Sequence, residues 1–134
     1  MMTNRSNRSS VGWMSRLGIG FIVGLEISLV DNFLFAGEVS PIVIVALLLA
    51  VAFASGAKWG WLGWFAAAGM WICIPAAHLV KHVLDLPDTL HPNTYTSILM
   101  LAAFTLVVAA IGFVCGALSR KLWLRRDVVD VAIF

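Results

Sequence analysis

The sequence predicts an all-α integral membrane protein, a single domain of four transmembrane helices with both termini in the cytoplasm. Of its 134 residues, 61% are apolar and 12% are charged, whereas soluble domains average about 45–50% apolar and about 25% charged residues. The mean hydropathy is +0.96. This composition argues against a disordered chain, a basic nucleic-acid-binding domain and a soluble enzyme with a polar surface.

The distribution of charge predicts where the membrane spans lie. Three stretches carry no charged residue, namely residues 39–57, 59–80 and 89–119. A helix needs about 20 mostly apolar residues to cross the hydrocarbon core, and it satisfies its own backbone polar groups there. Another stretch near the N-terminus is apolar apart from Glu26 and Asp31. We therefore expect spans at about residues 14–35, 41–57, 60–84 and 94–119.

The basic residues predict the orientation of these spans. Loops that stay in the cytoplasm carry an excess of Lys and Arg. With four spans, one side holds eight basic residues: Arg5, Arg8, Arg16, Lys58, Arg120, Lys121, Arg125 and Arg126. The other side holds Lys81 alone, with three acidic residues. We expect a multi-pass protein of the plasma (inner) membrane, a disordered segment at residues 1–10 and a cytoplasmic juxtamembrane tail at residues 120–134.

Proline, glycine and polar residues mark the connections. The segment 55–58 reads as a tight turn, so the second and third spans should form an antiparallel hairpin. Pro75 falls inside the third span, where it cannot donate a backbone hydrogen bond. Pro87 disfavours helical geometry in the residue before it, so the third helix should end by Leu86. Asn93 or Thr94 is the expected N-cap of the fourth helix.

Glycines recur every four residues in two of the spans. Gly20 and Gly24 lie in the first span, and Gly112 and Gly116 lie in the last. Such pairs allow close approach of helices in lipid. Two interpretations stay open: the first and fourth helices pack against each other, or the glycines form a contact between subunits.

Glu26, Asp31 and Asn32 are candidates for an ion or proton pathway. An ionised carboxylate inside a bilayer costs about 2.5–3.5 kcal/mol on insertion scales, and such residues are often functional. The alternative is a structural role, in which Glu26 is hydrogen-bonded to Trp71 or Thr105.

The three histidines fall on one side of the predicted membrane. His78 and His82 are four residues apart and share a helix face with Asp85. Two imidazoles and a carboxylate at this spacing are a candidate site for a divalent metal. The spacing alone has low specificity, so a solvated helix end and a proton or ion path remain alternatives.

The last basic residues should contact the bilayer surface. Arg120, Lys121, Arg125 and Arg126 alternate with apolar residues beside a span, as in segments that bind anionic lipid head groups. Nucleic acid is not an expected partner. Cys73 and Cys115 lie at different depths, so we expect two free, buried thiols.

Three hypotheses for function follow. The first is an oligomeric channel or transporter for an ion or small solute, with Glu26 in the pathway. The second is a non-catalytic accessory subunit of a larger membrane complex. The third is a metal-binding protein or a membrane-embedded enzyme using the histidines, although we expect no enzymatic activity and no tightly bound cofactor.

Overall fold

The computed structural model describes residues 5–33, 41–88, 90–92 and 94–132, and these contain helices but no strand. The elements in chain order are α1 (Arg5–Phe33), α2 (Pro41–Trp59), the short 3-10 helix η2 (Gly60–Gly63), α3 (Trp64–Val83) and α4 (Tyr95–Ala132). The prediction of an all-α chain is therefore confirmed. Three stretches are long and apolar enough to cross a membrane: Gly12–Asp31, Ile42–Val83 and Tyr95–Arg125.

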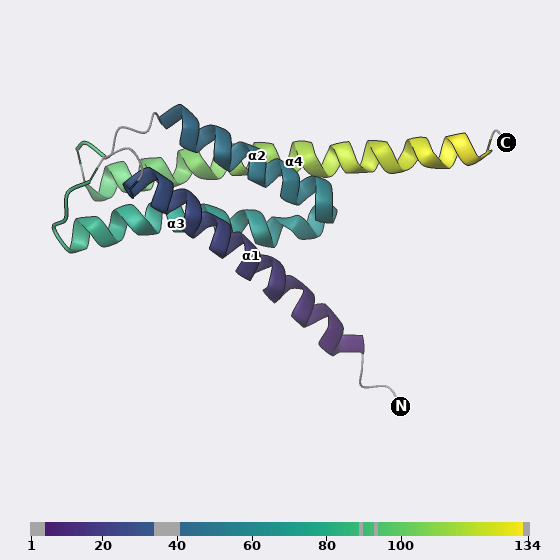
Figure 1. Cartoon of the computed structure of the whole chain (residues 1–134), viewed down its shortest axis with the longest axis horizontal. Coiled ribbons are helices and arrows are strands. Elements are labelled where there is room, and N and C mark those ends of the chain that lie inside the picture. The colour runs from purple at the N-terminus through teal and green to yellow at the C-terminus, as the bar shows by residue number, and fades with distance from the viewer. Residues whose placement is uncertain (1–4, 34–40, 89, 93, 133–134) are drawn as a thin grey trace.

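The second of these stretches folds back on itself. It has 42 residues, and it comprises α2, η2 and α3, which form an antiparallel hairpin (Figure 1). The chain turns at Gly60, whose φ of +60° lies in the left-handed region that glycine adopts without a steric penalty. We call the end of the molecule that contains η2 the basic end, and the end that contains the α3–α4 loop the loop end.

Two helices are longer than the spans that the sequence predicts. α1 starts at Arg5, within the segment expected to be disordered, and α4 continues to Ala132, through most of the expected tail. Once a helix exists, each added residue gains a hydrogen bond without a new nucleation cost. Polar composition is therefore a poor guide to where a membrane helix stops. In Figure 1, α4 projects beyond the other helices at the basic end, and the first part of α1 diverges from them.

Local hydrogen bonds define both ends of the α3–α4 loop. The amide of Leu86 donates to the Lys81 carbonyl (2.9 Å), and the amide of Asp85 donates to the His82 carbonyl (3.4 Å). With Asp85 at φ +52°, this is a Schellman C-cap. The Thr94 hydroxyl accepts a hydrogen bond from the Ser97 amide (3.2 Å), which confirms Thr94 as the N-cap of α4. Asn93 lies outside the described residues.

The helices pack in two pairs, α1 on α3 and α2 on α4. Gly20 meets the Ala66 backbone, and a Cβ on Gly24 would lie 2.6 Å from the Met70 carbonyl oxygen. In the other pair, Gly116 meets the Phe53 backbone. Glycine is needed at these points because any side chain would separate the helix backbones.

The predicted contact between the glycines of the first and last helices is therefore wrong. A Cβ on Gly112 would lie 2.6 Å from the Leu49 carbonyl oxygen, so this glycine also faces α2. All four glycines contact the neighbouring helix of the same chain rather than each other, and they are not available as a contact between subunits.

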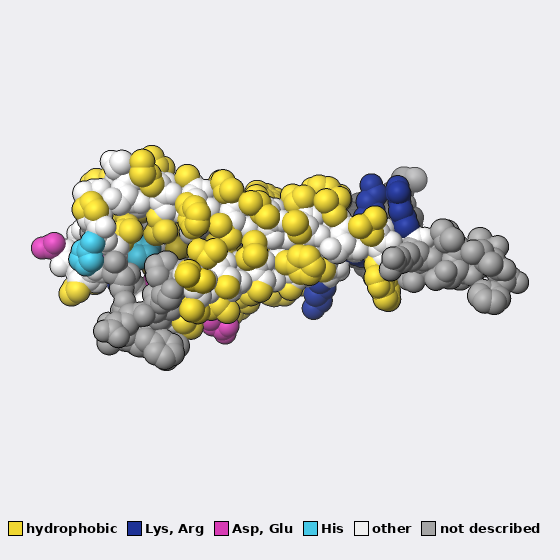
Figure 2. Space-filling model, turned by 90° about the horizontal axis from the view of Figure 1, so that it is seen from above, with side chains coloured by type: hydrophobic (Ala, Val, Ile, Leu, Met, Phe, Trp, Pro, Cys, Tyr) yellow, Lys and Arg dark blue, Asp and Glu magenta, His cyan; other side chains and the backbone are white. Residues whose placement is uncertain are grey.

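The core lies where the two helix pairs meet. Its most buried members are Leu48 and Ala52 of α2, Ala67 and Met70 of α3, and Ala109 of α4. Large apolar side chains cover the outside: on the face seen in Figure 2, hydrophobic side chains form a wide band, Lys and Arg gather towards one end, and His lies at the other. This distribution is expected of a protein whose middle contacts lipid.

Candidate functional site

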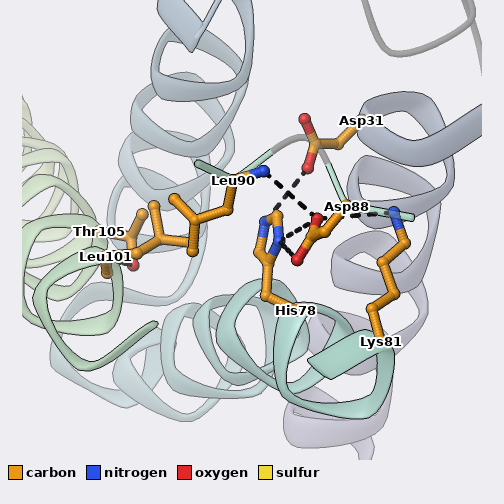
Figure 3. A network of polar contacts seen from close by, with 7 residues as sticks. All are labelled: Asp31, His78, Lys81, Asp88, Leu90, Leu101 and Thr105. Carbon is orange, nitrogen blue, oxygen red and sulfur yellow. Dashed lines mark hydrogen bonds and ion pairs between the residues drawn. The ribbon is translucent and has the colours of Figure 1, made fainter. Parts of the chain in front are cut away.

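A cluster of charged side chains is enclosed at the loop end, around His78 of α3. Its Nδ1 lies 2.8 and 2.9 Å from the two carboxylate oxygens of Asp88. Its Nε2 lies 3.5 Å from Oδ2 of Asp31, on α1. Figure 3 shows the ring with one nitrogen directed at each carboxylate. His78 thus joins α1 to the loop that follows α3.

Two further groups complete the surroundings of Asp88. The Lys81 ammonium lies 3.7 Å from Oδ1 of Asp88, and the Leu90 amide donates to the same oxygen (3.5 Å). The side chains of Asp88 and His78 are only 1% and 5% exposed. Burial by itself raises the pKa of the Asp88 carboxyl. The hydrogen bond and charge of His78, helped by Leu90 and Lys81, outweigh burial and hold this pKa below its ordinary value of 3.8.

The geometry favours the doubly protonated form of His78. A neutral imidazole donates from one nitrogen only, whereas the imidazolium donates from both. Here each ring nitrogen faces a carboxylate oxygen. The cluster then contains two negative carboxylates and two positive groups, His78 and Lys81, so its charges balance. Balanced, hydrogen-bonded charges are the form in which ionised groups tolerate burial.

Glu26 lies apart from this cluster and faces outward. It follows Gly24, which contacts Met70, and precedes Asp31, which contacts His78. It is therefore level with the middle of α3. Its side chain is exposed on α1, and among the described residues no hydrogen bond or ion pair reaches it.

The two expected partners of Glu26 form other contacts. Trp71 donates its indole N–H to the Ala102 carbonyl (2.9 Å). The Thr105 hydroxyl donates to the Leu101 carbonyl (2.7 Å) within α4. The structural role considered for Glu26, a bond to Trp71 or Thr105, is therefore wrong.

The residues of the predicted metal site are not brought together. His78 is engaged by two carboxylates, and the His82 ring stacks edge-to-face on Tyr95 with centroids 4.4 Å apart. Asp85 is exposed and has a positive φ just after Leu84, the C-cap of α3. No group of three His, Cys, Asp or Glu side chains within the described ranges is arranged to hold a metal.

The remaining candidate residues lie at different places in the structure and do not form one site. Asp31 joins the buried cluster, whereas the side chain of Asn32 lies outside the described residues. Arg120, Lys121 and Arg125 are exposed on the part of α4 at the basic end, and the side chain of Arg126 is not described. Both cysteines are free, but only Cys73 is buried, so the expectation that Cys115 is buried is wrong.

Asp88 and Lys81 are the members of the cluster that sequence reasoning missed as site residues. The sequence feature that could have identified Asp88 is the turn expected at residues 86–89, which contains Pro87. A turn that follows the C-cap of α3 returns the chain over the last turns of that helix, which include His78. Sequence spacing within α3 pointed instead to Asp85, which shares the His78 face only if the helix continues.

Comparison of this chain with protein-family models, curated proteins and solved structures gives no match. The fold and the site must therefore support any functional conclusion by themselves.

Proposed function

We propose that this protein crosses the plasma (inner) membrane four times, with both termini in the cytoplasm, and assembles into oligomers that conduct protons or small cations. Glu26 carries the ion at the contact between subunits. The loop-end cluster of Asp31, His78, Lys81 and Asp88 stands at the outer side of this route.

The exposed carboxylate of Glu26 is the observation that carries this proposal. A carboxyl group that faces lipid at the middle of a helix bundle loses its hydration without gaining a partner, which costs several kcal/mol. A pathway between subunits supplies water or an ion at that position. The interior of a single chain offers no such path, since Leu48, Ala52 and Met70 fill its centre.

The positions of the basic residues support four crossings. α1 and α3 run from the basic end to the loop end, and α2 and α4 run back. Lys58 lies at the end of α2, and Arg120 and Lys121 lie on α4 at the same end of the molecule. The excess of Lys and Arg on one side favours that side as the cytoplasmic one.

Flux through reconstituted vesicles tests the role of Glu26. The purified chain is placed in liposomes, a potassium diffusion potential is imposed, and proton entry is followed with an internal pH-sensitive dye. Glu26→Gln should abolish flux, whereas Glu26→Asp should retain part of it because it keeps the ionisable group. Leu25→Ala, a change of the neighbouring exposed residue, is the matched control and should conduct normally. Flux through Glu26→Gln equal to that of the unmodified chain would sink the proposal.

An accessory subunit of a larger complex is the second candidate. It is favoured by the glycine contacts, because Gly20, Gly24, Gly112 and Gly116 are all used within the chain and leave no such stripe for self-association. Glu26 would then pair with a basic residue of another protein. Native mass spectrometry after gentle extraction distinguishes the oligomer from the accessory subunit. A multiple of the 14.5 kDa chain supports the oligomer, and a stoichiometric second polypeptide supports the accessory subunit.

A further inference from the structure

We propose that the groove between α1 and α2 at the basic end binds one anionic phospholipid, with an acyl chain between the walls of α1 and α2 and the phosphate at Lys58. This proposal is independent of the role of Glu26, because it concerns a different part of the membrane-facing surface and a different ligand.

The groove arises from the divergence of α1. α1 packs on α3 but only slightly on α2, and its N-terminal part moves away from α2 towards the basic end (Figure 1). The space left encloses about 130 Å³. Its floor is formed by small and flexible side chains of α3, namely Ala66, Ala67 and Met70. These floor residues are almost fully buried, at 1–4% exposed, so an acyl chain in the groove would lie above them, between α1 and α2.

The walls of the groove suit hydrocarbon. α1 contributes Ile19, Gly20 and Val23, and α2 contributes Val51 and Ala54. These residues belong to stretches that are long and apolar enough to cross a membrane. An opening of this kind within a bilayer is filled by lipid tails, since an unfilled space forfeits the dispersion contacts of its walls.

The charge at the end of the groove determines which lipid it prefers and at which end the lipid phosphate lies. Lys58 lies at the basic end of the groove, and its ammonium is 5.2 Å from the centre of the Trp59 ring. A cation beside an indole is the arrangement that meets head groups at the membrane–water interface. A phosphate is therefore attracted to the basic end of the groove, where Lys58 lies, and the apolar lining receives the acyl chain.

Lipid retention by the full-length protein tests the proposal. The chain is purified in mild detergent, mixed with phosphatidylglycerol or phosphatidylcholine, and examined by native mass spectrometry. One phosphatidylglycerol should be retained per chain, in preference to phosphatidylcholine. Lys58→Gln should reduce its apparent affinity by about fivefold, the effect of one lysine near an anionic surface. Arg125→Gln, which changes an exposed cation outside the groove, should leave this bound lipid in place.

A second pair of variants tests the groove itself. Ala54→Phe places a ring in the groove and should abolish retention while Lys58 is intact. Ala46→Phe adds the same ring to an exposed position of α2 outside the groove. This control variant should retain the lipid. Equal retention of the two lipids, unaffected by Lys58→Gln and by Ala54→Phe, would overturn the proposal. A dimer without lipid that Ala54→Phe dissociates would also overturn it, because the occupant would then be a second copy of the chain.

Discussion

His78 connects α1, through Asp31, with the loop after α3, through Asp88. The contact with Asp31 joins residues 47 positions apart, and the contact with Asp88 joins residues ten positions apart across the C-terminal end of α3. A buried ion pair is weak evidence for net stability, because desolvation offsets the attraction. Removing one partner alone is costly, since the other charge then stays buried and unpaired.

We expect Asp88→Asn to lower the stability of the protein at neutral pH. The change removes a charged hydrogen-bond acceptor that is almost fully enclosed, which typically costs about 1.5–3 kcal/mol. Unfolding in detergent, followed by circular dichroism, measures the difference from the unmodified chain. Asp85→Asn is the matched control and should cause no loss, because Asp85 is exposed and asparagine readily adopts its positive φ.

The difference in stability between the unmodified chain and Asp88→Asn should decrease at low pH. The pKa of Asp88 is lower in the folded protein than the ordinary 3.8. The unfolded chain therefore binds the proton more readily, and the stabilisation is complete above the ordinary pKa and lost as the pH falls through the folded value. The gap between the unmodified chain and Asp88→Asn should therefore shrink as the pH falls below 4. A gap that does not change down to pH 3 would contradict the assigned role of Asp88.

The helices show which features of the fold can be predicted from sequence. Burial in lipid acts on each stretch separately, so the uncharged segments at residues 39–57, 59–80 and 89–119 locate α2, α3 and α4 without any knowledge of their neighbours. The choice of neighbour is different. Gly20 and Gly112 belong to similar small-residue patterns. Neither pattern predicts the neighbour, which is Ala66 for Gly20 and Leu49 for Gly112.

The candidate site depends on contacts that are even less local. Asp31 and His78 were both identified from their residue types, but their contact requires α1 to pack on α3 in a parallel sense. Asp88 was overlooked because its position over His78 depends on the Schellman cap at Asp85 and on the path of the loop. The sequence also could not predict that Glu26 is exposed, because its exposure depends on which face of α1 packs against α3.

Substitutions at two glycines of α1 test the close packing of α1 on α3. A Cβ at Gly20 would collide with the Ala66 backbone, whereas a Cβ at Gly18 would meet nothing within 4 Å. We expect Gly20→Ala to destabilise the protein by about 1–3 kcal/mol through overpacking. Gly18→Ala should be neutral or stabilise by up to about 1 kcal/mol, the difference in helix propensity. Equal changes in the free energy of unfolding, measured by denaturant titration in mixed micelles, would show that α1 does not approach α3 this closely.

At the scale of the whole molecule, the basic end and the loop end differ in chemistry as well as in charge. The basic end carries Lys58 and Arg120 together with the indole rings of Trp61 and Trp123, which are well exposed. Among the described residues, the loop end wholly or partly buries Asp31, His78, Lys81 and Asp88 in one cluster and exposes Asp85, but it exposes no Lys or Arg. Exposed cations and indoles anchor a protein at an anionic leaflet, so the two ends should not be interchangeable between the faces of a membrane.

Labelling of single cysteines from one side of the membrane tests the resulting topology. In a Cys73→Ala, Cys115→Ala background, cysteines are introduced by Gly12→Cys, Asp85→Cys and Lys121→Cys. In intact cells, a membrane-impermeant maleimide should label only the Asp85→Cys variant, and all three variants should react after the membrane is opened. The reason is that an even number of crossings places both ends of the chain on the side that holds the excess of Lys and Arg. Labelling of Lys121→Cys but not Gly12→Cys in intact cells would mean an odd number of crossings, and the hairpin of α2 and α3 would then not traverse the bilayer twice.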